Sequence, residues 1–435
     1  MRDRLNVHRQ RDYESAHAMP YDAPPRPAGA LRIAVFVNEF PALSETFVLN
    51  QITGLLDLGH DVTIFATRPR VETRVHRDVM RYRLWERLCY RGMPGSRLVR
   101  LAQAPGLLAK HRADREPFAK ALNPMRYGRE ATSLGMLYWA DRLAGHAPFD
   151  IVHCHFGIVG RTVAFLREIG AISGKLVTAF HGVDMSTCLD RDPGLYAHLF
   201  AHGDLFMPVS EHWRKRLVEH GCDPDRIVVH RMGIDPARFP QGEHKFSADG
   251  PATVLTIGRL VEKKGIEYGL RAVAKLAARG VPLRYEIVGD GPLRDGLQDL
   301  ARSLGIAGRV RFHGARVQED VARLMRQSDV FLAPSVTDAQ GDQEGIPVTI
   351  MEAMATGMPV VSSLHSGIPE LVDDGVGGFL VQERDVDGIA DALASLLGAP
   401  DRCRIMGKAA REKVLAMHNI ETLNRDLEGH FRALA

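Results

Sequence analysis

The strongest structural signal in this 435-residue chain is the segment Gln343-Glu344-Gly345-Ile346-Pro347-Val348-Thr349-Ile350-Met351-Glu352-Ala353-Met354-Ala355-Thr356-Gly357. Proline is favoured in the first turn of a helix and glycine directly after the last turn, so a short helix is predicted between Pro347 and Gly357. Glu344 then precedes this helix. Glu352 lies about five residues inside it, roughly 7.5 Å further along the axis. Two carboxylates therefore flank a helix N-terminus.

This arrangement suits a ligand that carries both a diphosphate and hydroxyl groups. The positive end of the helix can receive the diphosphate, while each carboxylate accepts hydrogen bonds from neutral hydroxyls on either side. A nucleotide sugar has this shape, with ribose and hexose joined by the anionic bridge. One acidic residue that favours the helix dipole, plus one solvated glutamate, would give the same pattern. The segment alone leaves both interpretations open.

The rest of the chain alternates short apolar runs with helical patterns, which predicts parallel sheets and an α/β fold. Strands are expected in the first half at 32–37, 62–66, 151–153, 176–180, 205–209 and 227–230. They are expected in the second half at 252–257, 284–288, 310–312, 330–333, 359–362 and 378–381. Two such sets predict two Rossmann-like domains that face each other across a cleft, which is the default ligand site.

The domain boundaries follow from composition. We expect a flexible N-terminal tail over 1–30, a first domain over 31–240, a second domain over 250–415, and a terminal helix over 416–435 whose packing the pattern does not reveal. The tail contains arginines and prolines but lacks the apolar core of a signal peptide. Between 233 and 251, proline and glycine interrupt both periodicities and mark the seam.

Cysteine usage and hydropathy predict a cytoplasmic protein. The five cysteines are widely spaced with no Cys-x-x-Cys, so a disulfide framework is not expected. No apolar run approaches the roughly 18 residues needed to cross a bilayer.

The net charge of +3 conceals a local excess. Residues 68–130 contain 16 Lys or Arg and 6 Asp or Glu, so this stretch carries +10. Trp85, Leu88, Tyr90 and several leucines lie among its arginines, as in an interfacial amphipathic segment. Two interpretations stay open: solvated helix faces, or peripheral contact with an anionic membrane at the inner face of the cell membrane. No nucleic-acid-binding motif accompanies the charge, so nucleic acid is not an expected partner.

Several segments resemble the retaining GT-B glycosyltransferases of family 4. The 343–357 segment resembles their Glu-x7-Glu signature, and Gly258-Arg259-Leu260-Val261-Glu262-Lys263-Lys264-Gly265 resembles a further family motif. Val288 to Leu293 and Val310 to Gly314 resemble two nucleotide-side segments. The stretch Asn38 to Phe47 and the loop Ser335 to Pro347 look like colanic-acid and amylovoran-type exopolysaccharide glycosyltransferases. The resemblance runs from about residue 31 to 420.

The resemblance implies roles by position. The implied catalytic residues are His181, Glu344, Arg259 and Lys264. The implied donor-binding residues are Gly258, Arg259, Lys264, Gly289, Gly291, His313, Glu344, Gly345, Ile346, Pro347 and Glu352. Among these, Arg259 and Lys264 match the diphosphate-binding pair, Glu344 the contact to the donor sugar, and Glu352 the ribose ligand. His181 follows a strand and would orient the donor sugar; an isolated histidine in such a place is otherwise usually structural.

The acceptor side is less marked. Many family members have a glycine-rich loop after the first strand, whereas this chain has Pro41 to Thr46, with Ser44 a plausible helix N-cap. Ser44, Glu45 and Thr46 are therefore expected to touch the acceptor or the sugar. His155 is expected there too, as the more exposed member of His153-Cys154-His155.

No metal site is expected. His153 and His155 share a strand face but lack a third ligand nearby. The Asp-x-Asp pairs at 190/192, 223/225 and 385/387 stand among prolines, glycines and helix starts, and are interpreted as turns or caps.

Together these patterns predict a metal-independent, cofactor-free retaining hexosyltransferase. Its partners would be a nucleotide-sugar donor, UDP-hexose first and GDP-mannose second, and a lipid-linked glycan acceptor. Alternatives are a nucleotide-sugar epimerase, a phosphorylase, or a non-catalytic nucleotide-sugar-binding protein on the same fold. A Rossmann dehydrogenase would need Gly-x-Gly-x-x-Gly after a first strand, and neither domain supplies it.

Overall fold

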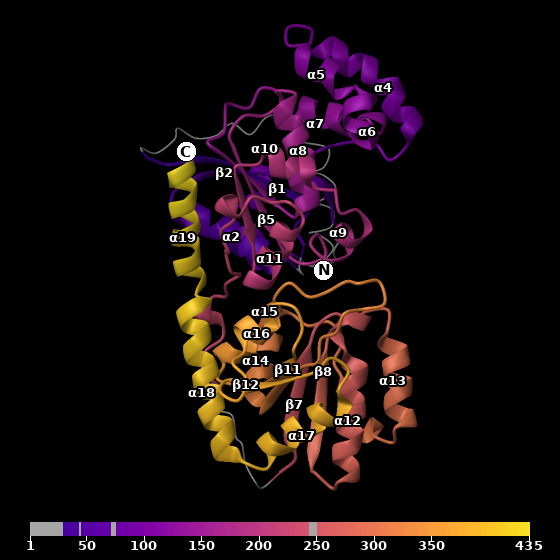
Figure 1. Ribbon diagram of the computed structural model, residues 1–435, viewed down its shortest axis with the longest axis vertical. Coiled ribbons are helices and arrows are strands. Elements are labelled where there is room, and N and C mark those ends of the chain that lie inside the picture. Colours follow the sequence, from indigo (N-terminus) through magenta and orange to yellow (C-terminus); the bar gives the residue numbers. More distant parts are fainter. Residues whose placement is uncertain (1–28, 43–44, 71–74, 243–249) are drawn as a thin grey trace.

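The computed structural model describes residues 29–42, 45–70, 75–242 and 250–435. It contains two six-stranded parallel sheets flanked by helices (Figure 1). Their strand orders are β3-β2-β1-β4-β5-β6 and β12-β11-β10-β7-β8-β9. Within each set of six, this is the same doubly wound order, 3-2-1-4-5-6. The predicted α/β class with two Rossmann-like domains is confirmed.

The first sheet differs from the prediction in one strand. Its members are β1 (Arg32–Phe40), β2 (Asp61–Pro69), β3 (Leu88–Tyr90), β4 (Ile151–His155), β5 (Lys175–Phe180) and β6 (Leu205–Pro208). The predicted strand at 227–230 is wrong, because that segment forms only an isolated parallel bridge, Ile227 with Phe206, where Val228 and His230 donate their amides to β6 carbonyls. Pro208 has no N–H to return such a bond. The sixth strand is β3, inside the basic stretch.

The helices of the first domain fall into two groups. Those beside the sheet are α2 (Thr46–Asp57), α3 (Arg77–Arg81), α8 (Gly157–Glu168), α9 (Thr187–Arg191), α10 (Ala197–His202) and α11 (Glu211–Glu219). Between β3 and β4 come α4 (Arg97–Lys110), α5 (Glu116–Ala121), α6 (Pro124–Thr132) and α7 (Gly135–Leu143). In Figure 1, α4, α5 and α6 project from the end of the first domain that is remote from the second.

The second sheet agrees with the predicted strands to within a residue or two. It consists of β7 (Ala252–Ile257), β8 (Leu283–Val288), β9 (Val310–Phe312), β10 (Val330–Ala333), β11 (Val360–Ser363) and β12 (Gly378–Val381). Its helices are α12 (Ile266–Ala278), α13 (Arg294–Ser303), α14 (Gln318–Gln327), α15 (Val348–Ala355), α16 (Ile368–Leu371) and α17 (Val386–Leu397).

The chain ends by returning to the first domain. Helix α18 (Pro400–Met417) runs along the second domain, and α19 (Ile420–Leu434) continues beside the first (Figure 1). Leu427 and Phe431 are fully buried in a cluster with β1 and β2 residues. Asn424 lies against Gly54 of α2, where a side chain would collide with it. The last helix is therefore a structural part of the first domain.

Two further expectations concern chemistry and hydropathy. All five cysteines are free, as expected from their spacing. Within the described residues, no helix is both long and apolar enough to cross a membrane.

Candidate active site

Glu344 forms a buried ion pair at the entrance to α15. Its carboxylate Oε1 lies 2.8 Å from Lys264 Nζ, and the residue is only 7% exposed. Burial disfavours the charged form, but Lys264 and Lys263 outweigh it, so the pKa of Glu344 lies below its usual range. The second lysine is itself held by Asp342, 2.8 Å away. The Lys264–Glu344 pair brings together two residues that are 80 positions apart in sequence.

His365 and Glu383 support the backbone of Glu344, and no sequence pattern had marked either residue. The Glu344 amide donates to His365 Nε2 at 3.0 Å, and His365 Nδ1 lies 2.6 Å from Glu383 Oε1. Because Nε2 accepts, the ring proton is on Nδ1 and is donated to Glu383. Glu383 also accepts the Thr337 amide at 2.9 Å. This chain fixes the loop that carries Glu344.

Glu352 lies inside α15, as predicted, and is 8% exposed. Burial alone raises its pKa to about 8. Hydrogen bonds from the hydroxyl groups of a ligand would stabilise this buried carboxyl group, because they would replace its lost hydration.

Glu352 therefore makes folding depend on pH. An unfolded glutamate ionises near pH 4.5, whereas the folded residue stays protonated up to about pH 8, so the stability it contributes is lost as pH rises between these values. We expect Glu352→Gln, which mimics the protonated state, to gain on the order of 3 kcal/mol relative to wild type between pH 5 and pH 7.5. Urea unfolding at both pH values measures this. Glu267→Gln, at the exposed start of α12, should show no such change.

The glycines at the ends of β7 and β8 pack on one another. A side chain at Gly289, which has a φ of +137°, would overlap the Gly258 carbonyl, and one at Gly291 would lie 2.6 Å from the Leu260 carbonyl. Gly258 in turn lies beneath the Lys264 stem, with 3.3 Å from its would-be Cβ to Cδ. The missing side chains at 289 and 291 therefore face protein backbone, which by itself explains the need for glycine.

Two predicted donor residues make no ion pair with Glu344 or Lys264 among the described residues. Arg259 is exposed, and no carboxylate among the described residues pairs with it. His313 contacts Glu286 through Nε2, in a cavity of about 430 Å³ that three arginines also line. Those arginines are Arg311, Arg316 and Arg323.

His181 reaches the same region from the first domain. A side chain at Gly345 would overlap the His181 carbonyl oxygen, and one at Gly182 would lie 2.9 Å from the Gly345 amide. Trp213 Nε1 also donates to the Gly345 carbonyl at 3.4 Å. The loop after β5 and the loop before α15 are therefore in direct backbone contact across the domain interface.

Asp184, to which the sequence assigned no role, organises the His181 loop. Its carboxylate accepts the amides of His181 and Gly182 at 3.1 and 2.9 Å through Oδ1, and that of Gly157 at 3.0 Å through Oδ2. Burial nevertheless outweighs these three bonds, and the pKa of Asp184 is raised. One buried carboxyl group ties the end of β5 to the start of α8.

His155 is fully buried, so the expectation that it is the more exposed of its pair is wrong. Its Nδ1 lies 3.1 Å from His181 Nε2, and the two rings stack. Burial, with neighbouring His153 and His230, lowers the pKa of His181 to about 3. An imidazole with this pKa is neutral near pH 7 and is a poor general base. The contact with His155 holds the His181 ring in one orientation.

Two other groups of predicted residues can be placed in part. Ser44 lies outside the described residues, and the N-cap of α2 is Glu45, not Ser44, with Thr46 its first residue. The Asp-x-Asp pairs form turns and caps: Asp223 and Asp385 cap helices, and Asp192 accepts the Gly194 amide.

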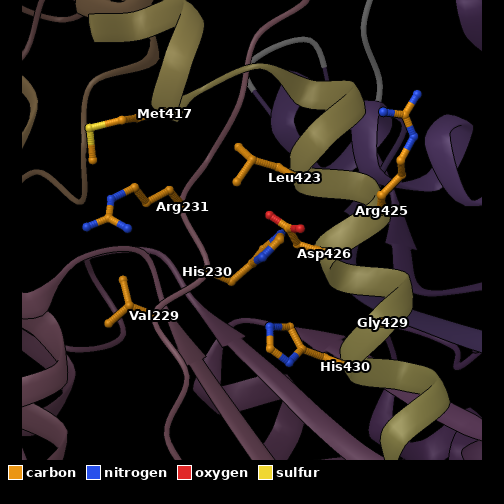
Figure 2. A pocket seen from close by; sticks show the side chains of 9 residues that line it. All are labelled: Val229, His230, Arg231, Met417, Leu423, Arg425, Asp426, Gly429 and His430. Carbon is orange, nitrogen blue, oxygen red and sulfur yellow. The ribbon is translucent and has the colours of Figure 1, made fainter.

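A cavity of about 460 Å³ lies between the first domain and the final helix (Figure 2). It is lined by Val229, His230, Arg231, Met417, Leu423, Arg425, Asp426, Gly429 and His430. Burial and His430 lower the pKa of His230 to about 4. This cavity contains none of the residues predicted for donor or acceptor, and is separate from the Glu344 pair.

Family models match both domains. The model described as Glycosyl transferases group 1 matches residues 241–413, and the model described as Glycosyltransferase Family 4 matches residues 44–238. A Salmonella typhimurium protein named as a colanic acid biosynthesis glycosyltransferase, WcaL, is 39% identical over 91% of this chain and 98% of its own. The amylovoran biosynthesis glycosyltransferase AmsK of Erwinia amylovora is 36% identical over 93% of this chain and 100% of its own.

Solved structures share the fold at lower identity. HepE of Anabaena, in complex with UDP and glucose, has a TM-score of 0.69 and 17% identity over 92% of this chain and 99% of its own. Sucrose-phosphate synthase of Thermosynechococcus elongatus has a TM-score of 0.67 and 19% identity over 93% and 99%. Fold and sequence thus define a GT-B glycosyltransferase. The chain belongs to glycosyltransferase family 4, as its motifs indicated.

Proposed function

We propose that this chain transfers a hexose from a nucleotide sugar to a lipid-linked glycan in exopolysaccharide biosynthesis, with retention of anomeric configuration and without a metal. The observation that carries the proposal is the Lys264–Glu344 pair, which stands before α15 and opposite the His181 loop. The names of WcaL and AmsK support exopolysaccharide biosynthesis, and the UDP and glucose bound to HepE support a UDP-hexose donor. GDP-mannose is the second candidate.

In this proposal the chain's cations replace a metal. Lys264, the exposed Arg259 and the N-terminus of α15 stabilise the departing diphosphate, while Glu344 and Glu352 bind hydroxyls of the hexose and the ribose. The acceptor hydroxyl attacks the anomeric carbon on the face from which the diphosphate leaves, so one C–O bond forms as the other breaks. The departing diphosphate oxygen, which lies on that same face, accepts the proton of the hydroxyl. His181, with its low pKa, orients the sugar and takes no proton.

The test is a donor panel followed by product analysis. We expect a UDP-hexose to raise the unfolding midpoint most, because a ligand of the native state stabilises by RT ln(1 + [L]/Kd). With a lipid-diphosphate acceptor and a chelator present, NMR should show an α-linked product from an α-linked donor. An inverted product, epimerised donor, or activity only with added metal would contradict the proposal.

A lipid-linked acceptor would lie in a membrane, so the enzyme would have to approach a membrane surface. We infer that the projecting helix α4 makes this contact. This helix has no buried residue, and it exposes Leu98 and Leu101 beside the exposed Arg97. An exposed apolar edge among cations is complementary to an anionic lipid surface.

We expect Leu98→Ser/Leu101→Ser to weaken sedimentation with anionic vesicles by about tenfold or more, since each leucine loses roughly 2 kcal/mol of burial in the interface. Neutral phosphatidylcholine vesicles should bind little in either case. The same substitution type at exposed Ile405 on α18 serves as a control and should change nothing. If the wild-type protein bound neither kind of vesicle, the proposed membrane contact would be wrong. The proposal of sugar transfer would be unaffected.

A further inference from the structure

Two histidines and a carboxylate converge where the end of α8 lies beside α10, a contact visible in the upper domain of Figure 1. His198 and His202 are one turn apart on α10, and Glu168 is the last residue of α8. One ligand atom from each lies within 4.8 Å of the other two. Histidines four residues apart present both rings on one helix face, which is the spacing of helical zinc ligands.

His202 and Glu168 each use one polar atom for a hydrogen bond to another part of the protein. The second polar atom of each side chain, the inner one, faces the cluster and is available to a metal. His202 Nδ1 lies 2.9 Å from the His198 carbonyl oxygen; a carbonyl only accepts, so Nδ1 carries the proton and Nε2 presents its lone pair. Glu168 Oε1 accepts from Arg126 Nε at 2.9 Å, which leaves Oε2 for another partner. Histidines and carboxylates that bind metals are oriented by outer partners of this kind.

Among the described residues, two of the inner atoms, His198 Nε2 and Glu168 Oε2, have only an ion-pair contact with each other. His198 Nε2 and Glu168 Oε2 lie 3.1 Å apart, and both are buried. Neither makes a hydrogen bond of acceptable geometry to any described residue. A cation bound between them would give each atom the partner of good geometry that their mutual contact does not supply.

The distances suit a small tetrahedral cation. Zinc bonds of 2.0–2.2 Å place neighbouring ligands about 3.4 Å apart, close to the observed N–O distance. The ligand atom of His202 lies within 4.8 Å of the other two, so a small shift of its exposed ring completes the set. We propose that Glu168 Oε2, His198 Nε2 and His202 Nε2 bind Zn²⁺, with water as the fourth ligand. The site ties α8 to α10.

This site is separate from sugar transfer. Glu168 and Gly157 are opposite ends of α8, about 16 Å apart along the axis. Gly157 is the end that Asp184 holds beside His181. Zinc would therefore stabilise the first domain without taking part in sugar transfer. The experiments on zinc binding and those on metal-independent transfer test separate proposals.

The test uses the full chain after treatment with a chelator. We expect ZnCl₂ to bind at one equivalent in titration calorimetry and, at a hundred times Kd, to raise the unfolding midpoint by roughly 3 °C. Co²⁺ should give the visible absorption of tetrahedral coordination. His202→Ala and Glu168→Gln should each weaken zinc binding by about tenfold or more.

His220→Ala is the matched control. His220 makes the same bond from its Nδ1 to the carbonyl four residues earlier, at 2.8 Å, but lies outside the metal-ligand cluster found among the described residues. Its variant should bind zinc like wild type. Zinc binding that survives His202→Ala at unchanged affinity, or wild type that binds no zinc at one equivalent, would overturn the proposal.

Discussion

Lys264→Met is expected to lower kcat/KM for glycosyl transfer by about a hundredfold to a thousandfold. The substitution removes the cation proposed to face the departing diphosphate, and such a loss is typical when one stabilising group is removed from a transition state. Methionine keeps the stem that packs over Gly258, so the backbone beneath it has no reason to move. Steady-state kinetics with the donor identified by the panel measure the effect.

The same substitution leaves Glu344 buried without its nearest cation, and this cost is separable from catalysis. We expect Lys264→Met to lose about 3 kcal/mol of unfolding free energy, since breaking a buried pair from one side leaves an uncompensated charge. Adding Glu344→Gln should recover most of that stability but none of the activity. Lys275→Met, which breaks an exposed pair with Asp387, should change neither quantity by much. Full activity in Lys264→Met would refute the proposed mechanism.

Local patterns predicted most of the fold. The apolar strands of both sheets are signalled by their own composition, and Pro347 and Gly357 bound α15 to within a residue. The pattern failed at β3, whose Leu88-Cys89-Tyr90 core is three residues long between arginines. It predicted the final helix but not where that helix packs, because its contact with α2 joins positions more than 370 residues apart.

The candidate site was also predicted only in part, since some of its residues were predicted but their contacts were not. Glu344 and Lys264 were predicted individually, and their pairing follows only from the folded sheet. Asp184, His365 and Glu383 were missed because each acts by holding backbone amides or another side chain. Such residues leave no spacing or composition signal. Their role depends on where loops from distant strands meet.

Gly345→Ala is expected to reduce kcat/KM by about a hundredfold while leaving each domain folded. The added methyl group would overlap the His181 carbonyl oxygen, whereas an ordinary contact needs about 3.4 Å. Gly345 does not have a positive φ, so the substitution strains no backbone angle within its own loop. The collision lies between domains, and separating them relieves it. A misplacement of about 1 Å between reacting groups can cost a hundredfold in rate.

The design separates this clash from a general effect of replacing glycine. Gly296 lies within α13 with open space around its missing side chain, so Gly296→Ala should retain activity and gain up to about 1 kcal/mol of stability. Donor binding to Gly345→Ala, measured by thermal shift, should weaken less than turnover, because Lys264 and Glu352 remain on the second domain. If Gly345→Ala turned over normally, contact between the His181 loop and the α15 loop would not be needed for transfer, and His181 would lose its proposed role.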